Sequence, residues 1–405
     1  MLVGTKLALT RVGKRIHSRH LRGSTARPEA EAIAERSIRR RRPGGRNVLF
    51  LSHCGFTGNS AYHVYSIATE LERLDWSPAI AVPRSPGGVR DLGRPRFQVL
   101  SFRDVLRGEL RFPDGNGPDL VHAFTPRKPI RDLTLVLVRH YGFPYVVHLE
   151  DNEMAVQAAV VSTYDPAAVT AFLDAAAGVS AVIDRLLELK PDRIPGGVIW
   201  PGYDESIDRP GRSRESIRHD IGLGEDELAI LYPGNVHEVN ADEVSNLYEA
   251  VKSLRASGRN LILVKSGWTR VSSTRLPKLG RGIRDLGWIS RRRVLELLSA
   301  ADILVQPGSP GPFNDYRFPS KLPEFLASGR PVVLPRSNIG LHLRDGVEAM
   351  LLKDGGPDEI SEKVALLEAD PELREQLGER GRAFAQRELQ WSKNVHEVVR
   401  LYEKT

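Results

Sequence analysis

Short apolar runs alternate with amphipathic stretches along most of this chain. The apolar run 48–51 is followed by a turn that contains Gly58, and then by apolar residues at helical intervals from 61 to 71. A second apolar run follows at 78–82. A short apolar run bounded by turn residues predicts a buried strand, whereas a 3.6-residue period predicts a helix. The order strand, helix, strand predicts a right-handed βαβ unit with parallel strands.

The same alternation continues to the end of the chain. Further strands are predicted at 97–100, 120–124, 145–148, 178–182, 197–200, 228–232, 261–264, 283–288, 303–305 and 332–334. Helices are predicted at 130–140, 167–175, 183–190, 241–256, 291–300, 357–369, 371–389 and 391–403. Strands that alternate with helices are typical of parallel sheets in α/β proteins.

We therefore predict the α/β fold class, with two Rossmann-like parallel-sheet domains that follow a basic N-terminal extension. The polar run 204–220 is interpreted as the connection between the domains. The predicted boundaries are 1–46 for the extension, 47–204 for the first domain, 205–390 for the second domain and 391–405 for a terminal helix.

The basic charge of the chain is concentrated at its N-terminal end. The net charge is +7, but residues 1–46 contain thirteen Lys and Arg against three Glu, a net +10. The remaining residues therefore carry 7 − 10 = −3. A nearly neutral folded body argues against nucleic acid as a partner, because a duplex site needs several phosphate contacts from the folded surface.

Three interpretations of residues 1–46 stay open. The segment is a weakly ordered solubilising extension, an arm that binds anionic lipid head groups at roughly 1 kcal/mol per basic residue, or a segment for nucleic-acid contact or organelle targeting. The sequence has a single cysteine, Cys54, and no run of 18 apolar residues. We therefore expect no disulfide framework and no transmembrane helix. The expected location is the cytoplasm, peripheral on the inner face of the membrane where the arm binds lipid.

Residues 312–335 form the most informative stretch of the sequence. Acidic, basic and amide side chains crowd a proline-rich loop that leads into a short helix. Ser320 is predicted to cap this helix through its hydroxyl group, and Gly329 is predicted to end it. Glu324 falls in the first turn, beside backbone N–H groups that lack helical partners. This arrangement predicts a position that holds a nucleotide.

Polar and ionisable residues also collect where other predicted strands end. His148, Glu150 and Glu153 follow one strand, and Lys265 ends another. Ligands of open α/β sheets bind outside the carboxyl ends of the strands. His122 lies inside a predicted strand and is interpreted as structural. The sequence contains no Cys/His cluster and no His-Glu-x-x-His motif, so no metal site is predicted.

Taken in order, these motifs resemble the family 4 retaining glycosyltransferases. The matching segments are the turn around Gly58 and the segments 147–148, 200–204, 286–288, 314–335 and 391–392. Among them, 314–335 is the specific signal. The resemblance implies the GT-B architecture, in which two Rossmann-like domains face each other across a cleft. It also implies that the final helix crosses back onto the first domain.

The resemblance implies roles for the residues of the specific stretch. In the family, an acidic residue and a glutamate separated by seven residues define the donor site. Glu324 fits the second position and is expected to bond the nucleotide ribose, because one carboxylate accepts from two hydroxyls. Tyr316 stands at the first position. Asp315, one residue earlier, is therefore expected to serve the sugar, with Asn314 as the alternative.

The diphosphate of the donor must be neutralised by other residues than in the family. Asn235 and Asn240 stand where the family usually has Arg and Lys. Developing negative charge on the leaving group dominates the barrier of such a reaction. Lys265, Arg317 and Lys321 are therefore the expected donor-binding cations.

In the first domain, the resemblance implies that His148 contacts the donor sugar and that Gly58 approaches the donor. His148 and Asp315 are thus the predicted catalytic residues. Glu150 and Glu153 are expected to bind acceptor hydroxyls. The alternatives are a structural histidine and solvated loop carboxylates.

Structural interpretations also stay open for the second domain. If these residues bind no ligand, Glu324 balances the helix dipole and Asp315 is a solvated loop acid. Arg317 then forms a salt bridge with Asp315, and Lys265 and Lys321 have no ligand role.

The predicted function is transfer of a sugar from a nucleotide diphosphate donor to an acceptor hydroxyl, with retention of configuration, in bacterial cell-surface glycan or glycolipid synthesis. The expected partners are the nucleotide sugar, a glycan or lipid-linked acceptor and an anionic membrane surface. No cofactor and no metal are expected. The alternatives are a nucleotide-sugar epimerase, a glycogen-phosphorylase-like enzyme, a nucleic-acid-directed glucosyltransferase and a non-catalytic nucleotide-sugar-binding protein.

Overall fold

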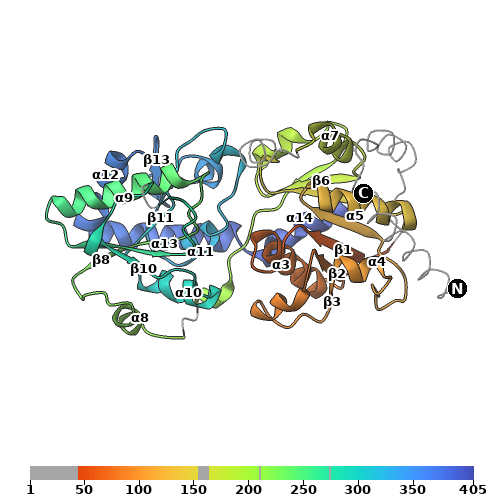
Figure 1. Ribbon diagram of the computed structural model, residues 1–405, viewed down its shortest axis with the longest axis horizontal. Coiled ribbons are helices and arrows are strands. Elements are labelled where there is room, and N and C mark those ends of the chain that lie inside the picture. The colour runs from red at the N-terminus through yellow and green to blue at the C-terminus, as the bar shows by residue number, and fades with distance from the viewer. Residues whose placement is uncertain (1–43, 154–163, 209–210, 273–274) are drawn as a thin grey trace. The chain divides into compact units, whose positions relative to one another are not determined.

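The protein is described by a computed structural model that divides into two compact units (Figure 1). The described residues are 44–153, 164–208, 211–272 and 275–405. The first unit comprises the residues up to Trp200 together with Trp391–Thr405, and the second comprises Pro201–Gln390. Nearly all of the predicted extension at 1–46 lies outside the described residues.

A seven-stranded parallel sheet forms the first unit, with the strand order β3-β2-β1-β4-β5-β6-β7. The strands are β1 (Asn47–Ser52), β2 (Ser77–Val82), β3 (Gln98–Ser101), β4 (Leu120–Phe124), β5 (Tyr145–Leu149), β6 (Gly178–Ala181) and β7 (Gly196–Val198). The α-helices among its described residues are α3 (Asn59–Arg73), α4 (Phe102–Leu106), α5 (Lys128–Tyr141), α7 (Pro166–Asp174) and α14 (Trp391–Glu403). Two 3-10 helices are η1 (Pro86–Asp91) and η2 (Asp184–Leu189).

A six-stranded parallel sheet forms the second unit, with the order β10-β9-β8-β11-β12-β13. The strands are β8 (Leu228–Pro233), β9 (Leu261–Ser266), β10 (Ile283–Asp285), β11 (Ile303–Val305), β12 (Val332–Pro335) and β13 (Met350–Leu352). The α-helices are α8 (Arg214–Asp220), α9 (Ala241–Ala256), α10 (Arg291–Ala300), α11 (Leu322–Ala327), α12 (Pro357–Ala369) and α13 (Pro371–Glu388). The 3-10 helices are η3 (Glu205–Asp208), η4 (Gly280–Gly282), η5 (Asn314–Tyr316) and η6 (Asn338–His342).

The predicted fold class is confirmed, and most elements lie within a few residues of their predicted positions. Two short α-helices and one strand were not predicted, namely α4, α8 and β13, and neither were the 3-10 helices η1, η3, η4, η5 and η6. α8 lies inside the run 204–220, and only Ile217 and Arg218 of this helix are buried. Its apolar stripe is therefore too small to show as a periodic pattern. The segment predicted as a helix at 183–190 forms the 3-10 helix η2.

The prediction that Ser320 caps α11 is wrong. The N-cap position belongs to Lys321, and no side chain caps this helix. The chain enters the helix through a turn in which the Leu322 N–H donates to Pro319 O, 3.0 Å away. The predicted end is confirmed, since Gly329 follows the helix with φ +72°, a conformation that glycine adopts at low cost.

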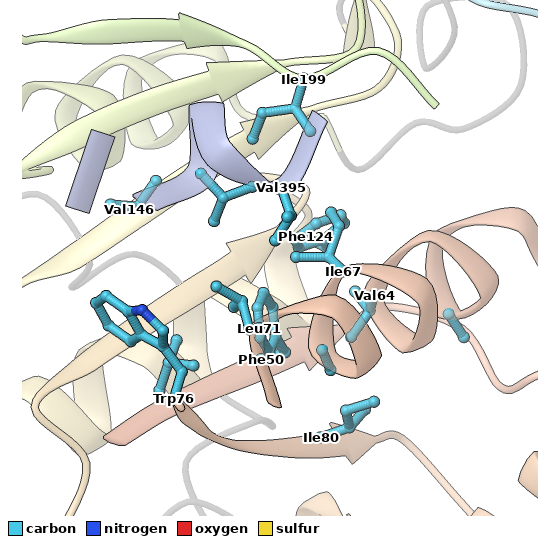
Figure 2. Close-up of a cluster of buried hydrophobic side chains, with 14 of the residues drawn as sticks. Phe50, Val64, Ile67, Leu71, Trp76, Ile80, Phe124, Val146, Ile199 and Val395 are labelled. Carbon is cyan, nitrogen blue, oxygen red and sulfur yellow. The ribbon is translucent and has the colours of Figure 1, made fainter. Parts of the chain in front are cut away.

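The core of the first unit lies between its sheet and the helices α3 and α14. Phe50, Phe124 and Val146 of the sheet are buried with Ile67 of α3 and Val395 of α14 (Figure 2). A buried side chain of this size stabilises the fold by about 1.5–3 kcal/mol relative to an exposed one. The last helix of the chain is therefore an integral part of the first unit.

Each sheet has one point at which the chain order reverses. In the first unit this point lies between β1 and β4, and in the second it lies between β8 and β11. The loops that leave two such strands run in opposite directions, and ligands of open α/β sheets bind outside the carboxyl ends of the strands there. The loops after these four strands are therefore the places to search for a site.

Candidate functional site

Glu324, the central residue of the predicted donor site, is buried in the first turn of α11 and paired with Arg291. An Arg291 amino group donates to Glu324 Oε1, and the Arg291 Nε lies 3.5 Å from Asp204 Oδ2. Burial raises the pKa of the Glu324 carboxyl even though Arg291 opposes the rise. The carboxylate thus has a fixed position and one basic neighbour, and both features suit an acceptor of hydroxyl hydrogen bonds.

Lys321 belongs to the loop that follows β11, and its side chain contacts the end of β8, the neighbouring strand at the reversal point. Its Nζ is 4.4 Å from the centre of the Tyr232 ring, within the range of a cation–π interaction. Within the described residues it forms no ion pair, although the charge of Glu243 acts on it. Burial, with a contribution from Arg317, lowers the pKa of the Lys321 ammonium to about 7. An incoming anion would favour the protonated form of Lys321 and raise this pKa.

Gly234, the first residue after β8, leaves room for the Lys321 ammonium because it has no side chain. A Cβ at this position would lie 2.4 Å from Lys321 Nζ and 2.9 Å from the Tyr232 ring. Any larger residue would therefore displace the ammonium. The Gly234 N–H donates to Ser266 O, 2.9 Å away, which anchors the loop to the end of β9.

Arg317 forms an ion pair with Glu243 of α9, with 3.1 Å between its nitrogen and Oε2. Its guanidinium also lies 4.2 Å from the centre of the Phe313 ring. Glu243 accepts a further hydrogen bond from the buried Asn314 side chain. The alternative interpretation of Arg317, a salt bridge with Asp315, is therefore wrong, because Glu243 of α9 is its ion-pair partner.

Of the two predicted sugar-binding candidates, Asp315 has the side chain with fewer hydrogen bonds. Its Oδ1 accepts one long hydrogen bond, 3.3 Å, from the Gly311 N–H, and its side chain is partly exposed. Asn314, in contrast, donates to Ser309 O at 2.7 Å as well as to Glu243. The Asn314 side chain therefore organises the loop, and Asp315 keeps most of its accepting capacity.

Lys265 is fully buried, although it was expected to contact the diphosphate. Its ammonium donates to Gly267 O at 2.9 Å and lies 3.3 Å from the Asp285 carboxylate. It thus joins the ends of β9 and β10. The contact of Lys265 with a diphosphate stays a prediction.

In the first unit, Glu150 is withdrawn from solvent rather than solvated. Ser60 of α3 donates to its Oε2, and His63 Nδ1 lies 3.0 Å from its Oε1. Burial opposes ionisation, yet the hydrogen bond from His63 and the nearby histidines lower the pKa of the carboxyl to about 2. The carboxylate is therefore ionised and held by two residues of one helix.

Glu153 and Gly58 also have defined local roles. Glu153 is buried and lies 2.8 Å from the Arg127 Nε, so it is not a solvated loop acid. Gly58 is the N-cap residue of α3, and a Cβ there would lie 2.5 Å from Cys54 Sγ. The expected contacts of Glu153 with an acceptor and of Gly58 with the donor stay predictions.

His148 is buried at the end of β5 and stacks on Phe124, with ring centres 4.2 Å apart. Its Nδ1 lies 2.8 Å from Ser180 Oγ. Burial lowers the pKa of the imidazole to about 3, so the ring is neutral at physiological pH. A neutral ring offers one donor and one acceptor, and Nδ1 is already engaged.

Sequence reasoning missed Arg291, His63 and Glu243, which hold predicted site residues in place. Arg291 begins three consecutive arginines at the start of α10, where the helix dipole disfavours cations. That pattern signals carboxylates nearby. His63 lies on the buried stripe of α3, and a polar residue on such a stripe signals a buried partner. Glu243 carries no comparable signal.

Residues 244–400 match a family model described as "Glycosyl transferase-like". A D-inositol 3-phosphate glycosyltransferase of Thermobifida fusca is 27% identical over 228 residues, which cover 52% of this chain and 50% of that protein. An uncharacterised glycosyltransferase of Methanocaldococcus jannaschii is 24% identical over 218 residues, 51% of this chain and 52% of that protein. The chain thus spans about half the length of the curated relatives it matches.

Solved structures match over most of the chain. The Anabaena protein HepE in complex with UDP-glucose has a TM-score of 0.68 and 14% identity, covering 88% of this chain and 99% of HepE. WaaG, a glycosyltransferase involved in lipopolysaccharide biosynthesis, has a TM-score of 0.61 and 17% identity, covering 86% and 97%. These likenesses show the GT-B fold. The segment 244–400 and the curated relatives carry the similarity to glycosyltransferases.

Across the part of the chain that the structure describes, every helix is too short or too polar to span a lipid bilayer.

Proposed function

We propose that this protein is a retaining glycosyltransferase that takes its sugar from a nucleoside diphosphate donor bound to the second unit. The observation that carries the proposal is the group at the β8/β11 reversal point. Lys321 provides a cation without an ion-pair partner among the described residues, and Glu324 provides a buried carboxylate on the helix that follows. Both residues fall inside the segment 244–400 that matches the glycosyltransferase model.

The ribose of a nucleoside diphosphate needs a hydrogen-bond acceptor, and its diphosphate needs positive charge. The residues at the β8/β11 reversal point supply both. The ribose presents hydroxyl donors, for which the Glu324 carboxylate is an acceptor. The diphosphate is an anion, for which Lys321 and Arg317 provide positive charge. In this proposal the two cations replace the Arg and Lys whose places are taken by Asn235 and Asn240. The same charge serves the leaving group, with no metal required.

The proposed mechanism leaves the acceptor proton to the departing phosphate. The bond between the anomeric carbon and the phosphate oxygen breaks, and the acceptor oxygen attacks from the same face. Its proton passes to a phosphate oxygen, so no protein nucleophile is needed. The work of the protein is then to orient the two substrates and to stabilise the departing charge. Within the second unit, Asp315 is proposed to position the sugar.

The acceptor is proposed to be a hydroxyl compound of a cell-surface glycan or a glycolipid. WaaG acts in lipopolysaccharide biosynthesis, and a lipid-borne acceptor would give the basic segment 1–46 a purpose. Residues 1–46 carry a net +10, which favours attraction to anionic head groups.

Deletion of residues 1–46 is expected to weaken binding to vesicles that contain anionic phospholipid. The attraction is electrostatic, so it should also fall as salt is raised. Co-sedimentation of the full chain and the truncated chain measures it, with neutral phosphatidylcholine vesicles as the control. Equal binding of the two chains to anionic vesicles contradicts the membrane proposal.

A panel of nucleotide sugars tests the proposed function directly. Full-length protein is incubated with UDP-, GDP-, ADP- and dTDP-sugars, and released nucleoside diphosphate is measured over hours. We expect slow hydrolysis of one donor class, because a site that stabilises the departing diphosphate also promotes transfer to water. The anomeric configuration of the first product then decides retention. If no donor binds or turns over, the glycosyltransferase proposal fails.

A further inference from the structure

A line of four hydrogen-bonded side chains crosses the first unit and ends at His148. The Tyr402 hydroxyl of α14 lies 2.7 Å from His122 Nδ1, and His122 Nε2 lies 2.8 Å from Ser180 Oγ. The same Ser180 oxygen lies 2.8 Å from His148 Nδ1. All four residues are 0–1% exposed. The line is therefore closed to water along its length.

Strand register brings these residues together on one face of the sheet. His148 of β5 pairs with Ser180 of β6, and Phe124 of β4 pairs with His148. Side chains alternate between faces along a strand, so His122, two residues before Phe124, shares the face of His148. Helix α14 packs against this sheet at β6 and β7, which brings Tyr402 to His122.

Burial determines the protonation state of each titratable group in the line. Burial lowers the pKa of both imidazoles, to about 3 for His148, and raises the pKa of the Tyr402 phenol. Near neutral pH each imidazole is therefore neutral, with one N–H and one bare nitrogen. The phenol and the Ser180 hydroxyl each keep one hydrogen. The three hydrogen bonds of the line can therefore all point the same way in two arrangements. Either they run from Tyr402 toward His148, or they run from His148 toward Tyr402.

Each direction leaves one hydrogen without an acceptor in the line: the Nε2 hydrogen of His148 when Tyr402 donates, and the Tyr402 hydroxyl hydrogen in the opposite case. His148 Nε2 is not among the fully buried atoms without a partner, so its hydrogen is open to solvent or to a ligand, whereas Tyr402 is fully buried. If Tyr402 donates to His122, then His122 donates to Ser180, and Ser180 donates to His148 Nδ1. In the opposite direction the Tyr402 hydrogen needs an acceptor beyond the line, and its hydroxyl bonds only His122 among the described residues. A buried donor without a partner is costly. The first direction is therefore favoured.

We infer that Tyr402, acting through His122 and Ser180, holds His148 in the tautomer that carries its hydrogen on Nε2. His148 then presents a hydrogen-bond donor to a ligand at the carboxyl edge of the first sheet. Within the described residues, His148 makes no hydrogen bond besides the one at Nδ1. Its ligand group must therefore be an acceptor, such as a sugar hydroxyl oxygen or a phosphate oxygen.

This inference rests on the proposed function only for the identity of the ligand. Tyr402, His122 and Ser180 are positioning residues, because they act on the ligand through His148. It also assigns a second task to α14. The helix completes the core of the first unit through Val395 and sets the donor state of a site residue through Tyr402.

Long-range ¹H–¹⁵N correlation spectra of the ligand-free, full-length protein, labelled with ¹⁵N-histidine, read the tautomer directly. We expect the Nδ1 of His148 to resonate as a bare ring nitrogen and Nε2 as a protonated one. His148→Gln identifies the signals by removing them. A wild-type His148 with its hydrogen on Nδ1 overturns the inference.

Two variants test the line itself. Tyr402→Phe and Ser180→Ala each remove one link, and both are expected to shift the His148 signals toward a mixture of tautomers. Tyr145→Phe is the matched control, because it deletes a buried hydroxyl that donates to Phe172 O at 2.7 Å on the other face of the sheet. It should leave the tautomer unchanged.

Unshifted His148 signals in both folded line variants overturn the role of the line, as do equal shifts in the Tyr145→Phe control. If Tyr402→Phe does not fold, Ser180→Ala and the wild-type spectrum decide the question. The spectra need no ligand. Failure of every nucleotide sugar in the panel would therefore refute the proposed function and leave the tautomer result standing.

Discussion

Replacement of Glu324 by alanine is expected to weaken donor binding by about 100-fold or more and to abolish measurable transfer. The carboxylate is proposed to accept two hydrogen bonds from the ribose, and hydrogen bonds to a charged group contribute about 1.5–3 kcal/mol each. Glu324→Gln keeps the shape and loses the charge, so it should fall between alanine and the wild type. Calorimetric titration with the donor found in the panel measures the change.

Glu296→Gln is the control for this experiment. Glu296 is a largely buried glutamate of α10 that pairs with Arg293 at 2.8 Å, and it has no place in the proposed site. It should bind the donor like the wild type. Thermal unfolding of each variant separates lost binding from lost structure, because Arg291 also contacts Glu324. Donor affinity that survives in folded Glu324→Ala would leave Glu324 as the partner of Arg291 alone.

Donor affinity is expected to fall as the pH rises through about 7, because Lys321 must carry its proton to hold the diphosphate. The pKa of Lys321 is lowered to about 7 by burial and by Arg317. A bound diphosphate raises that pKa again, so the complex holds a proton that the free protein lacks above pH 7. Linkage of one proton lowers affinity by up to about tenfold per pH unit above the free pKa.

Substitutions at Lys321 make this pH dependence specific. Lys321→Met should lower affinity below pH 7 and remove the pH dependence between about pH 7 and 9. Lys321→Arg should also remove it, because arginine stays protonated in proteins. Lys252→Met is the control. Lys252 is exposed on α9, and its one ion pair among the described residues is with Glu249 at 3.4 Å. An undiminished pH dependence in Lys321→Met would show that another group titrates.

Periodicity along the sequence was sufficient for most of the fold. Helix α9 has a long apolar stripe that includes Val244, Leu247 and Val251, and its predicted bounds of 241–256 are confirmed. Short elements such as α8 and β13 offer too few residues for a period to show. The Ser320 cap failed for a different reason, because the route of the chain into α11 is decided by the packing of the whole loop.

The candidate site was less predictable than the fold. Position along a helix or strand placed Glu324 in a first helical turn, and it placed His148 and Glu150 at the carboxyl end of a strand. It carried no information about their partners. Arg317 illustrates the limit, since its nearest acidic neighbour in sequence is Asp315 and its partner in space is Glu243. An ion pair forms with the group that tertiary packing brings within reach, whatever the separation in sequence.

The sequence by itself determined the alternation of strands and helices, the near-neutral charge of the body and the place of Glu324 at the start of a helix. These are consequences of local patterns and of composition. Only the tertiary structure decided that Lys321 lies over Tyr232 beside Gly234, and that Tyr402 reaches His122 across 280 positions of chain. Such contacts depend on sheet register and on the order of strands. Both are settled by the burial of whole faces, which no single stretch of sequence contains.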